Sequence, residues 1–230
     1  MKKPKIFIAC DTVKIGKVKK IISETQTNKL DIGYKFGLEF FYSKNGRNFI
    51  SKLKNKKIFA DKKIKDIPNT GSSAIKSLKD LKNISYITVH ISGGYQMLKS
   101  IKKVAKKSNK NLKIIGVTIL TSFSDSSIKQ VGHTRSVRDL VRIQAKLAKS
   151  VGLDGIVCSG HEAKQLKKIC KGMEIITPGI RLEGDSPGDQ KRVMSPKDAF
   201  KNGATAIVVG RSITHGNIKN NIKKLIKSLN

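Results

Sequence analysis

The chain has 230 residues, of which 38% are hydrophobic, and a formal net charge of +32. This length and composition suit one α/β domain with a sizeable core, and no apolar run approaches the roughly 18 residues of a membrane-spanning helix. The three cysteines are irregularly spaced, which argues against a disulfide framework and predicts a cytoplasmic location. Residues 1–12 are basic and then apolar but lead straight into a strand-like segment, so we expect no signal peptide.

The strong positive charge has two interpretations. A basic surface is the electrostatic footprint of nucleic-acid binding. The lysines, however, are spread along the whole chain, with no Arg-rich block and no interleaved aromatic residues. Because Asn and Ile are also abundant, we favour the composition bias of an A/T-rich genome and do not expect nucleic acid as a partner.

Eight short segments rich in Ile, Val and Phe recur along the chain, and their length and composition are typical of buried strands. They span residues 5–11, 30–37, 56–64, 86–90, 112–120, 153–159, 173–179 and 205–211. Helical patterns separate them, including apolar faces over 73–82, 137–152 and 217–230. Eight alternating strand and helix units in this length predict a (β/α)₈ TIM barrel that forms a single domain over residues 1–230.

A doubly wound open sheet is the alternative architecture. Such a sheet usually carries a Gly-rich fingerprint after its first strand, and residues 9–20 contain none. In a barrel, the active site lies at the carboxyl ends of the strands. The polar residues at those ends are therefore expected to share one mouth: Asp11, Lys35, Asp61, Lys63, His90, Thr121, Ser122, Ser159, Gly179, Gly210 and Arg211.

The third strand ends in an alternation of charge. Residues two apart in an extended strand point to the same face, so Asp61 and Lys63 are expected to enter the mouth together, where Lys35 can join them. Opposite charges in a low-dielectric cavity keep each other ionised at a desolvation cost. The alternative is an exposed ion pair, which contributes little.

The last two strand ends favour a phosphate site. Barrels often bind phosphate with the loops after strands 7 and 8. Gly179 and Gly210 let backbone N–H groups approach an anion, and Arg211 can supply a bidentate fork. Residues 180–194 form a long loop, which we expect to close over the phosphate with Arg181, Gln190 and Arg192.

Metal chemistry is not expected from the histidine positions. His90, His133, His161 and His215 show neither an H-E-x-x-H motif nor a zinc-ligand spacing with Cys.

Stretches along nearly the full length resemble the orotidine 5′-phosphate decarboxylase family. They occur in the family's order as ACD (9–11), KFGLEFF (35–41), DKKIKDIPNT (61–70), VHISGG (89–94), VTILTS (117–122), GLDGIVCS (152–159), TPGIR (177–181), GDQKR (188–192) and VVGRSIT (208–214). The D-x-K-x-x-D motif followed by I-P-N-T is the most specific of them. The family's (β/α)₈ barrel dimer agrees with the fold predicted from the strand pattern.

The resemblance implies decarboxylation of orotidine 5′-phosphate to UMP and CO₂ in pyrimidine biosynthesis, without a cofactor. Lys63 would protonate C6 of the pyrimidine, and Asp61 would lie near the substrate carboxylate. Lys35 would extend this charged array if residues 35–41 correspond to the family's lysine motif. If residues 30–36 correspond to it instead, Asp31 takes that position. Asp66 would complete the array.

The same resemblance implies a homodimer with shared sites. By this resemblance, Asp66 and Thr70 would enter the site of the partner subunit. Pro68 turns the chain abruptly past the strand end, so Asp66 need not face the mouth that Lys63 enters. The implied substrate contacts are the ribose at Asp11, the pyrimidine at Ser122, and the 5′-phosphate at Gln190, Gly210 and Arg211.

Two rival functions stay open at this point. The family of 3-keto-L-gulonate-6-phosphate decarboxylase shares the D-x-K-x-x-D motif but depends on magnesium, so sensitivity to EDTA distinguishes it. A non-catalytic basic barrel that binds nucleic acid predicts salt-dependent retention of DNA or RNA and no turnover.

Overall fold

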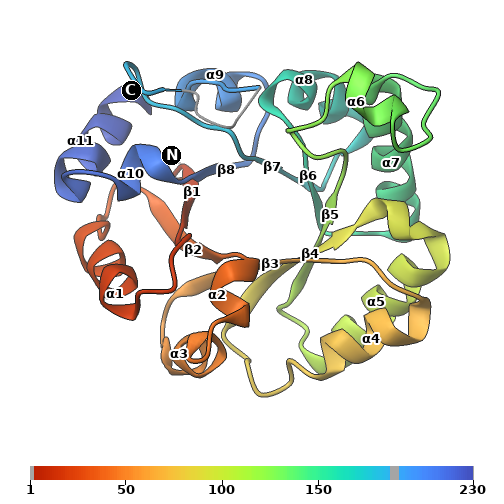
Figure 1. Cartoon of the computed structure of the whole chain (residues 1–230), viewed down its shortest axis with the longest axis horizontal. Helices are drawn as coiled ribbons and strands as arrows, with labels where there is room; N and C mark the ends of the chain where they lie inside the picture. Colours follow the sequence, from red (N-terminus) through yellow and green to blue (C-terminus); the bar gives the residue numbers. More distant parts are fainter. Residues whose placement is uncertain (1–2, 187–191, 230) are drawn as a thin grey trace.

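The computed structural model describes residues 3–186 and 192–229, and its strands close into a parallel barrel with the helices outside it (Figure 1). The strands are β1 (Lys5–Ala9), β2 (Asp31–Phe36), β3 (Lys57–Ile64), β4 (Ile84–His90), β5 (Lys113–Val117), β6 (Gly155–Val157), β7 (Glu174–Thr177) and β8 (Ala206–Val209). Because β1 pairs with both β2 and β8, the ring closes in chain order. The predicted (β/α)₈ barrel is therefore confirmed, and the open sheet is excluded.

Helices follow the strands around the ring. The longer ones are α1 (Ile15–Glu24), α4 (Pro68–Lys76), α5 (Gly94–Ser108), α7 (Val137–Val151), α8 (Gly160–Ile169) and α11 (Ile218–Leu229). Shorter ones are α2 (Leu38–Tyr42), α3 (Gly46–Lys52), η1 (Ile91–Gly93), α6 (Asp125–Lys129), α9 (Pro196–Lys201) and α10 (Arg211–Thr214). Throughout the described ranges, every helix is too short or too polar to cross a lipid bilayer.

Local sequence signals account for several helix ends. The Ser136 side chain accepts a hydrogen bond from the N–H of Asp139 at the start of α7, and Gly152 ends that helix with a left-handed φ of 77°. The helix predicted over 73–82 differs, because α4 begins at Pro68 and ends at Lys76. Turns with i to i+3 hydrogen bonds follow it and still bury Leu81 in the core.

Two hydrophobic clusters divide the core into an inner and an outer layer. Phe7 belongs to the cluster inside the barrel, whereas Ile6 and Ile8 belong to the cluster between strands and helices. This alternation follows from the period of two in a strand. The ring centroid of Phe7 lies 4.9 Å from that of Phe59 and 5.0 Å from that of Tyr86. The inner cluster thus packs three aromatic side chains together with aliphatic ones inside the barrel.

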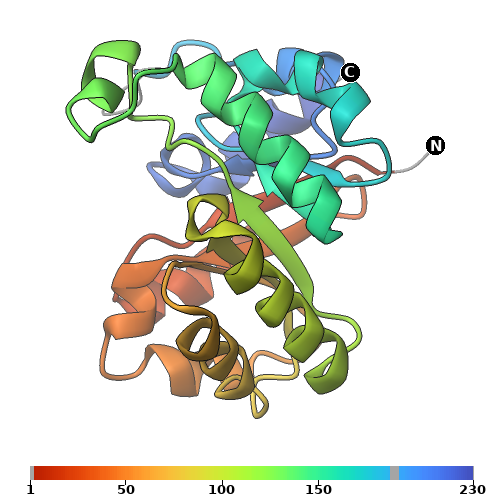
Figure 2. The same ribbon diagram turned by 90° about the vertical axis from the view of Figure 1, so that its right-hand side faces the viewer.

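A charged cluster closes the barrel at the amino ends of its strands. Glu174 Oε2 lies 2.8 Å from Lys5 Nζ, and its Oε1 pairs with Lys113 and accepts a hydrogen bond from the Tyr86 hydroxyl at 3.1 Å. Burial would raise the pKa of Glu174, but its hydrogen bonds with Lys113 and Lys5 outweigh burial and lower it. In side view, β1 begins at this end and α6 lies at the opposite end, where the strands finish (Figure 2).

Candidate active site

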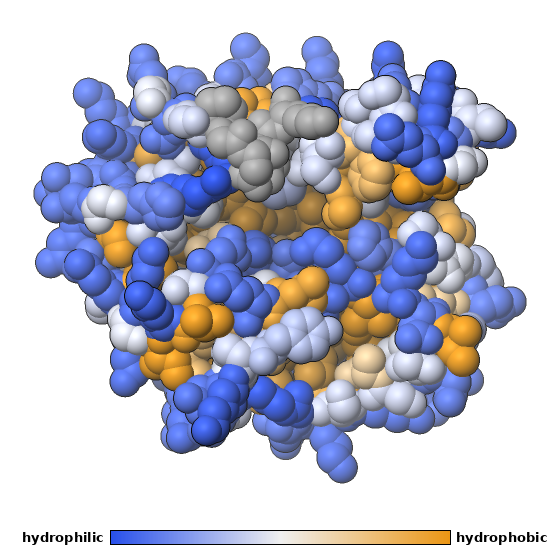
Figure 3. Space-filling view, viewed as in Figure 1, coloured by the Kyte–Doolittle hydropathy of each residue, from blue (hydrophilic) through white to orange (hydrophobic). Residues whose placement is uncertain are grey.

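A cavity of about 610 Å³ opens at the carboxyl ends of the strands. The space-filling view of this face shows hydrophilic residues around a central hollow in which hydrophobic residues are visible (Figure 3). The cavity is lined by most of the residues predicted at the strand ends: Asp11, Lys35, Asp61, Lys63, Thr121, Ser122, Gly179, Gly210 and Arg211. Arg181 of the predicted closing loop also lines it, whereas His90 and Ser159 do not. The barrel thus brings together side chains that are as far apart as 200 positions in the sequence.

Four charged side chains form a chain of ion pairs on one wall. Asp61 Oδ2 lies 2.8 Å from Lys63 Nζ and 3.4 Å from Lys35 Nζ, and Lys35 Nζ lies 3.2 Å from Asp11 Oδ1. Asp31, the alternative to Lys35, instead pairs with Lys57 at the start of β2 and β3, away from the mouth. The structure therefore places Lys35 in this array.

Mutual neutralisation keeps Asp61 and Lys35 ionised despite their burial. Burial would raise the pKa of the Asp61 carboxyl, but the charges of Lys35 and Lys63 and the hydrogen bonds from Lys63 and Thr88 outweigh it and lower the pKa. Burial would lower the pKa of Lys35, but Asp61 and Asp11 outweigh it and raise the pKa. The site thus presents a carboxylate and ammonium groups in fixed positions, as electrostatic catalysis requires.

The route by which Lys63 reaches the cavity differs from the prediction. Lys63 has a left-handed φ of 50° rather than an extended backbone. The pairing of β3 with β4 also shifts register between Ala60 and Ile64, which is a bulge. Asp61 and Lys63 do enter the mouth together, but a bulge brings them there, so the strand-alternation argument was wrong.

Thr88 is a residue of this site that the sequence interpretation missed. Its hydroxyl donates to Asp61 Oδ1 at 3.0 Å and accepts from the backbone N–H of Lys63 at 2.8 Å. The only signal in the sequence was one hydroxyl within the aliphatic end of β4, and such a threonine is usual in a strand.

Two predicted site residues lie outside the cavity, and the position of a third is not described. Asp66 and Thr70 are exposed, and neither lines this cavity. The Asp66 carboxylate accepts a hydrogen bond at 2.7 Å from the N–H of Ile67, just before α4 begins at Pro68. Gln190 lies outside the described residues. In the described subunit, therefore, the cavity is built without Asp66 and Thr70.

The corner expected to hold phosphate joins the ends of β7 and β8. Gly179, which has a φ of 74°, lines the cavity with Gly210 and Arg211, and Arg211 begins the short helix α10. The two ends of the predicted closing loop 180–194 pair with each other, because Arg181 N–H donates to Met194 O at 3.0 Å. This loop therefore leaves and returns at the rim, although 187–191 lie outside the described residues.

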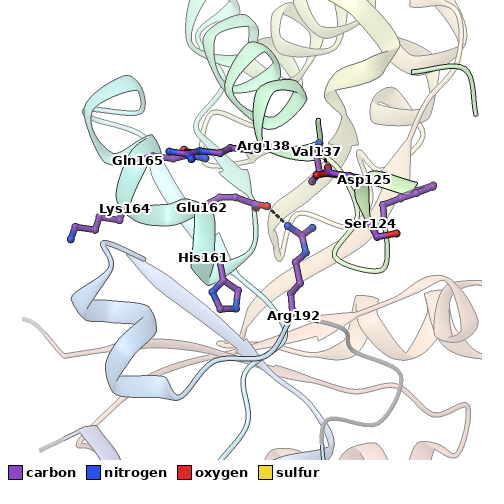
Figure 4. A pocket seen from close by; sticks show the side chains of 10 residues that line it. Ser124, Asp125, Val137, Arg138, His161, Glu162, Lys164, Gln165 and Arg192 are labelled. Carbon is purple, nitrogen blue, oxygen red and sulfur yellow. Dashed lines mark hydrogen bonds and ion pairs between the residues drawn. The ribbon is translucent and has the colours of Figure 1, made fainter. Parts of the chain in front are cut away.

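A second hollow, of about 650 Å³, lies beside the mouth and contains a buried ion pair (Figure 4). The side chain of Glu162 is 7% exposed and pairs with Arg192. Its Oε2 also accepts a hydrogen bond at 2.9 Å from the N–H of Ser159, which caps α8. Arg192 donates in addition to the Leu120 carbonyl at 3.4 Å. The Glu162–Arg192 pair thus ties together the segments that follow β5, β6 and β7.

We expect Glu162→Ala to lower the free energy of unfolding by about 3 kcal/mol, because it leaves the Arg192 guanidinium largely buried without its partner. Equilibrium urea unfolding measures this loss. The matched control is Asp80→Ala, which removes the exposed pair of Asp80 with Arg47 and should change stability by less than about 1 kcal/mol. Equal losses in both variants would contradict a structural role for the buried pair.

Comparison with known proteins identifies the family. A model of the Orotidine 5′-phosphate decarboxylase / HUMPS family matches residues 4–224. The chain belongs to this family. A relative from Wolbachia sp. subsp. Brugia malayi (strain TRS), named orotidine 5′-phosphate decarboxylase, is 42% identical over 229 residues, covering 97% of this chain and 98% of the relative.

Solved structures of the family share the whole barrel. Orotidine 5′-phosphate decarboxylase from Lactobacillus acidophilus superimposes with a TM-score of 0.83 at 36% identity, over 100% of both chains. The enzyme from Methanocaldococcus jannaschii, complexed with the inhibitor BMP, gives 0.77 at 28% identity, also over 100% of both. The expected family and its enzyme class, a carboxy-lyase, are therefore confirmed, whereas the role of each site residue stays a prediction.

Proposed function

We propose that the protein decarboxylates orotidine 5′-phosphate to UMP and CO₂ without a cofactor, in pyrimidine biosynthesis. The observation that carries this proposal is the buried Asp61 carboxylate held between two lysines in a cavity of the barrel mouth. Membership of the family supports the reaction, and the array supplies groups that suit it.

The chemistry asks the protein to stabilise negative charge on carbon. When the bond from C6 to the carboxylate breaks, CO₂ leaves and the electron pair stays on C6. The Lys63 ammonium faces this developing charge, stabilises it electrostatically and then donates the proton that completes UMP. Asp61, near the substrate carboxylate, repels it in the ground state. The electron pair left on C6 forms the new C–H bond with that proton, so no electron acceptor is needed, and solvent then reprotonates Lys63.

The remaining cavity residues are proposed to bind the rest of the substrate. Asp11 would hold a ribose hydroxyl, and Ser122 would contact the pyrimidine. The 5′-phosphate would lie at the corner of β7 and β8 against Gly210, Arg211, Arg181 and Gln190. Because the phosphate is remote from C6, its binding energy can organise the closed site and the charged array rather than act on the bond itself.

We expect Arg211→Ala to raise KM for orotidine 5′-phosphate about 100-fold, the effect of losing a charge-assisted contact. Turnover of orotidine, the nucleoside without phosphate, should change by less than about threefold. Steady-state kinetics with both substrates measure the difference. An equal loss for the two substrates would show that Arg211 does not act through the phosphate.

A spectrophotometric assay with orotidine 5′-phosphate tests the function directly. Retained turnover in EDTA separates it from a magnesium-dependent decarboxylase of a sugar phosphate. In the described part of the chain, no group of three or more His, Cys, Asp or Glu side chains is arranged to hold a metal ion. No turnover, together with salt-dependent retention of nucleic acid, would instead favour a binding protein.

A homodimer with shared sites is part of this proposal. Asp66 and Thr70 are exposed and lie outside the cavity of their own subunit. Between them, Ile67 is 66% exposed. A two-fold axis beside this segment would bury Ile67 and carry Asp66 and Thr70 into the cavity of the partner.

A further inference from the structure

One buried hydroxyl on β4, that of Thr88, contacts both Asp61 and Lys63. Thr88 is fully buried. It shares the inward face of β4 with Tyr86, two residues earlier, which belongs to the inner cluster. Thr88 therefore lies one layer above the aromatic floor of the barrel. Its Oγ1 donates to Asp61 Oδ1 at 3.0 Å and accepts from Lys63 N–H at 2.8 Å.

The pairing of β3 with β4 explains why this hydroxyl is needed. Ala60 pairs with Ile87, and the next pair is Ile64 with Val89. Three residues of β3, including Asp61 and Lys63, thus stand opposite Thr88 alone. The side chain of Thr88 takes the place of the missing backbone partner, because it satisfies the N–H of Lys63 where the ladder is interrupted.

The backbone conformation of Lys63 also requires a contact that holds it in place. A φ of 50° is unfavourable for a residue with a side chain, and it persists only where surrounding contacts enforce it. The hydrogen bond from Lys63 N–H to Thr88 is a contact of that kind, and it directs the ammonium group toward Asp61. A hydroxyl has one donor and two acceptor sites, so a single threonine can serve both residues at once.

We propose that Thr88 is a positioning residue of the decarboxylation, whose hydroxyl holds the bulge that aims Lys63 and fixes the Asp61 carboxylate beside it. The inference rests on the proposed function. It predicts that loss of the hydroxyl misplaces the proton donor while the contacts to phosphate, ribose and pyrimidine are kept. The effect should therefore fall on kcat rather than on KM.

The decisive comparison is between Thr88→Val and Thr88→Ser. Valine keeps the branched shape without the hydroxyl, and serine keeps the hydroxyl without the methyl group. We expect Thr88→Val to lower kcat about 100-fold, the scale of a small misplacement of a reacting group, with KM changed less than about threefold. Thr88→Ser should stay within about fivefold of the wild type. Equal kcat values for the two variants would overturn the proposal.

A matched control comes from β7. Thr177 is also fully buried, and its hydroxyl has no hydrogen-bond partner within the described ranges. Thr177→Val should leave kcat within about twofold, because no hydrogen bond is lost. If Thr88→Val does not fold, as judged by circular dichroism, Thr88→Ala replaces it and must show the same kcat loss.

The ionisation of Asp61 gives a readout that does not depend on turnover. Its pKa is lowered because the two lysines and the hydrogen bonds, including that from Thr88, outweigh burial. Thr88→Val removes one of those bonds, so the pKa should rise, and the acid limb of the kcat profile should move to higher pH. Thr88→Ser should leave both unchanged.

Carbon-13 NMR titration of the aspartates follows that pKa in the free protein. If the wild type fails to decarboxylate orotidine 5′-phosphate, the proposed function fails, but the titration still tests the role of Thr88. An Asp61 pKa that is the same in wild type and Thr88→Val would overturn the inference even with an active enzyme.

Discussion

We expect Lys63→Ala to lower kcat/KM for orotidine 5′-phosphate by at least about 10⁴-fold, the product of losing a general acid and an electrostatic stabiliser together. The reason is the position of Lys63 Nζ, 2.8 Å from the buried Asp61 carboxylate at the cavity wall. The variant should still fold and bind UMP, because the phosphate corner does not involve Lys63. Stopped assays at high enzyme concentration, with calorimetric titration of UMP, measure both.

The neighbouring lysine is the matched control for this variant. Lys62 Nζ stacks over the ring of Phe41, at 4.4 Å from its centroid, and does not line the cavity. Lys62→Ala removes the same charge one residue away and should keep kcat/KM within about threefold. Turnover of Lys63→Ala within tenfold of the wild type would remove Lys63 from the proposed role.

Mixing two inactive variants should restore activity to about a quarter of the wild type, as two-fold symmetry requires. Lys63→Ala and Asp66→Ala should each be inactive as homodimers. In a mixed dimer, one site receives both substitutions and the other receives neither. Random reassembly makes about half of the dimers mixed, each with one intact site of two. The measurement is activity after subunit exchange, verified by native mass spectrometry.

The charged array supplies the control for this experiment. Asp61 lies in the same cavity as Lys63 of its own subunit. Mixing Lys63→Ala with Asp61→Ala should therefore leave a lesion in every site and restore nothing. Absence of recovery with Asp66→Ala, after verified exchange, would rule out the shared site.

The barrel follows from the sequence because its determinants are local and repeated. Each strand is a short aliphatic run between helical patterns, and a parallel barrel buries both faces of every strand, so eight such runs specify the ring. The mouth follows as well, since parallel strands end on one side. Lys35, Asp61, Ser122 and Arg211 were predicted to meet there, and the structure places them around one cavity.

Only the tertiary structure decided how the array is held. The hydrogen bonds of Thr88 depend on the register between β3 and β4, and a bulge changes that register without a mark in the pattern of apolar residues. The Glu162–Arg192 pair joins segments 30 positions apart whose proximity follows from barrel closure. Long-range register and side-chain contacts of this kind arise when the sheet closes, because a local periodicity reports which face is buried but not which partner lies opposite.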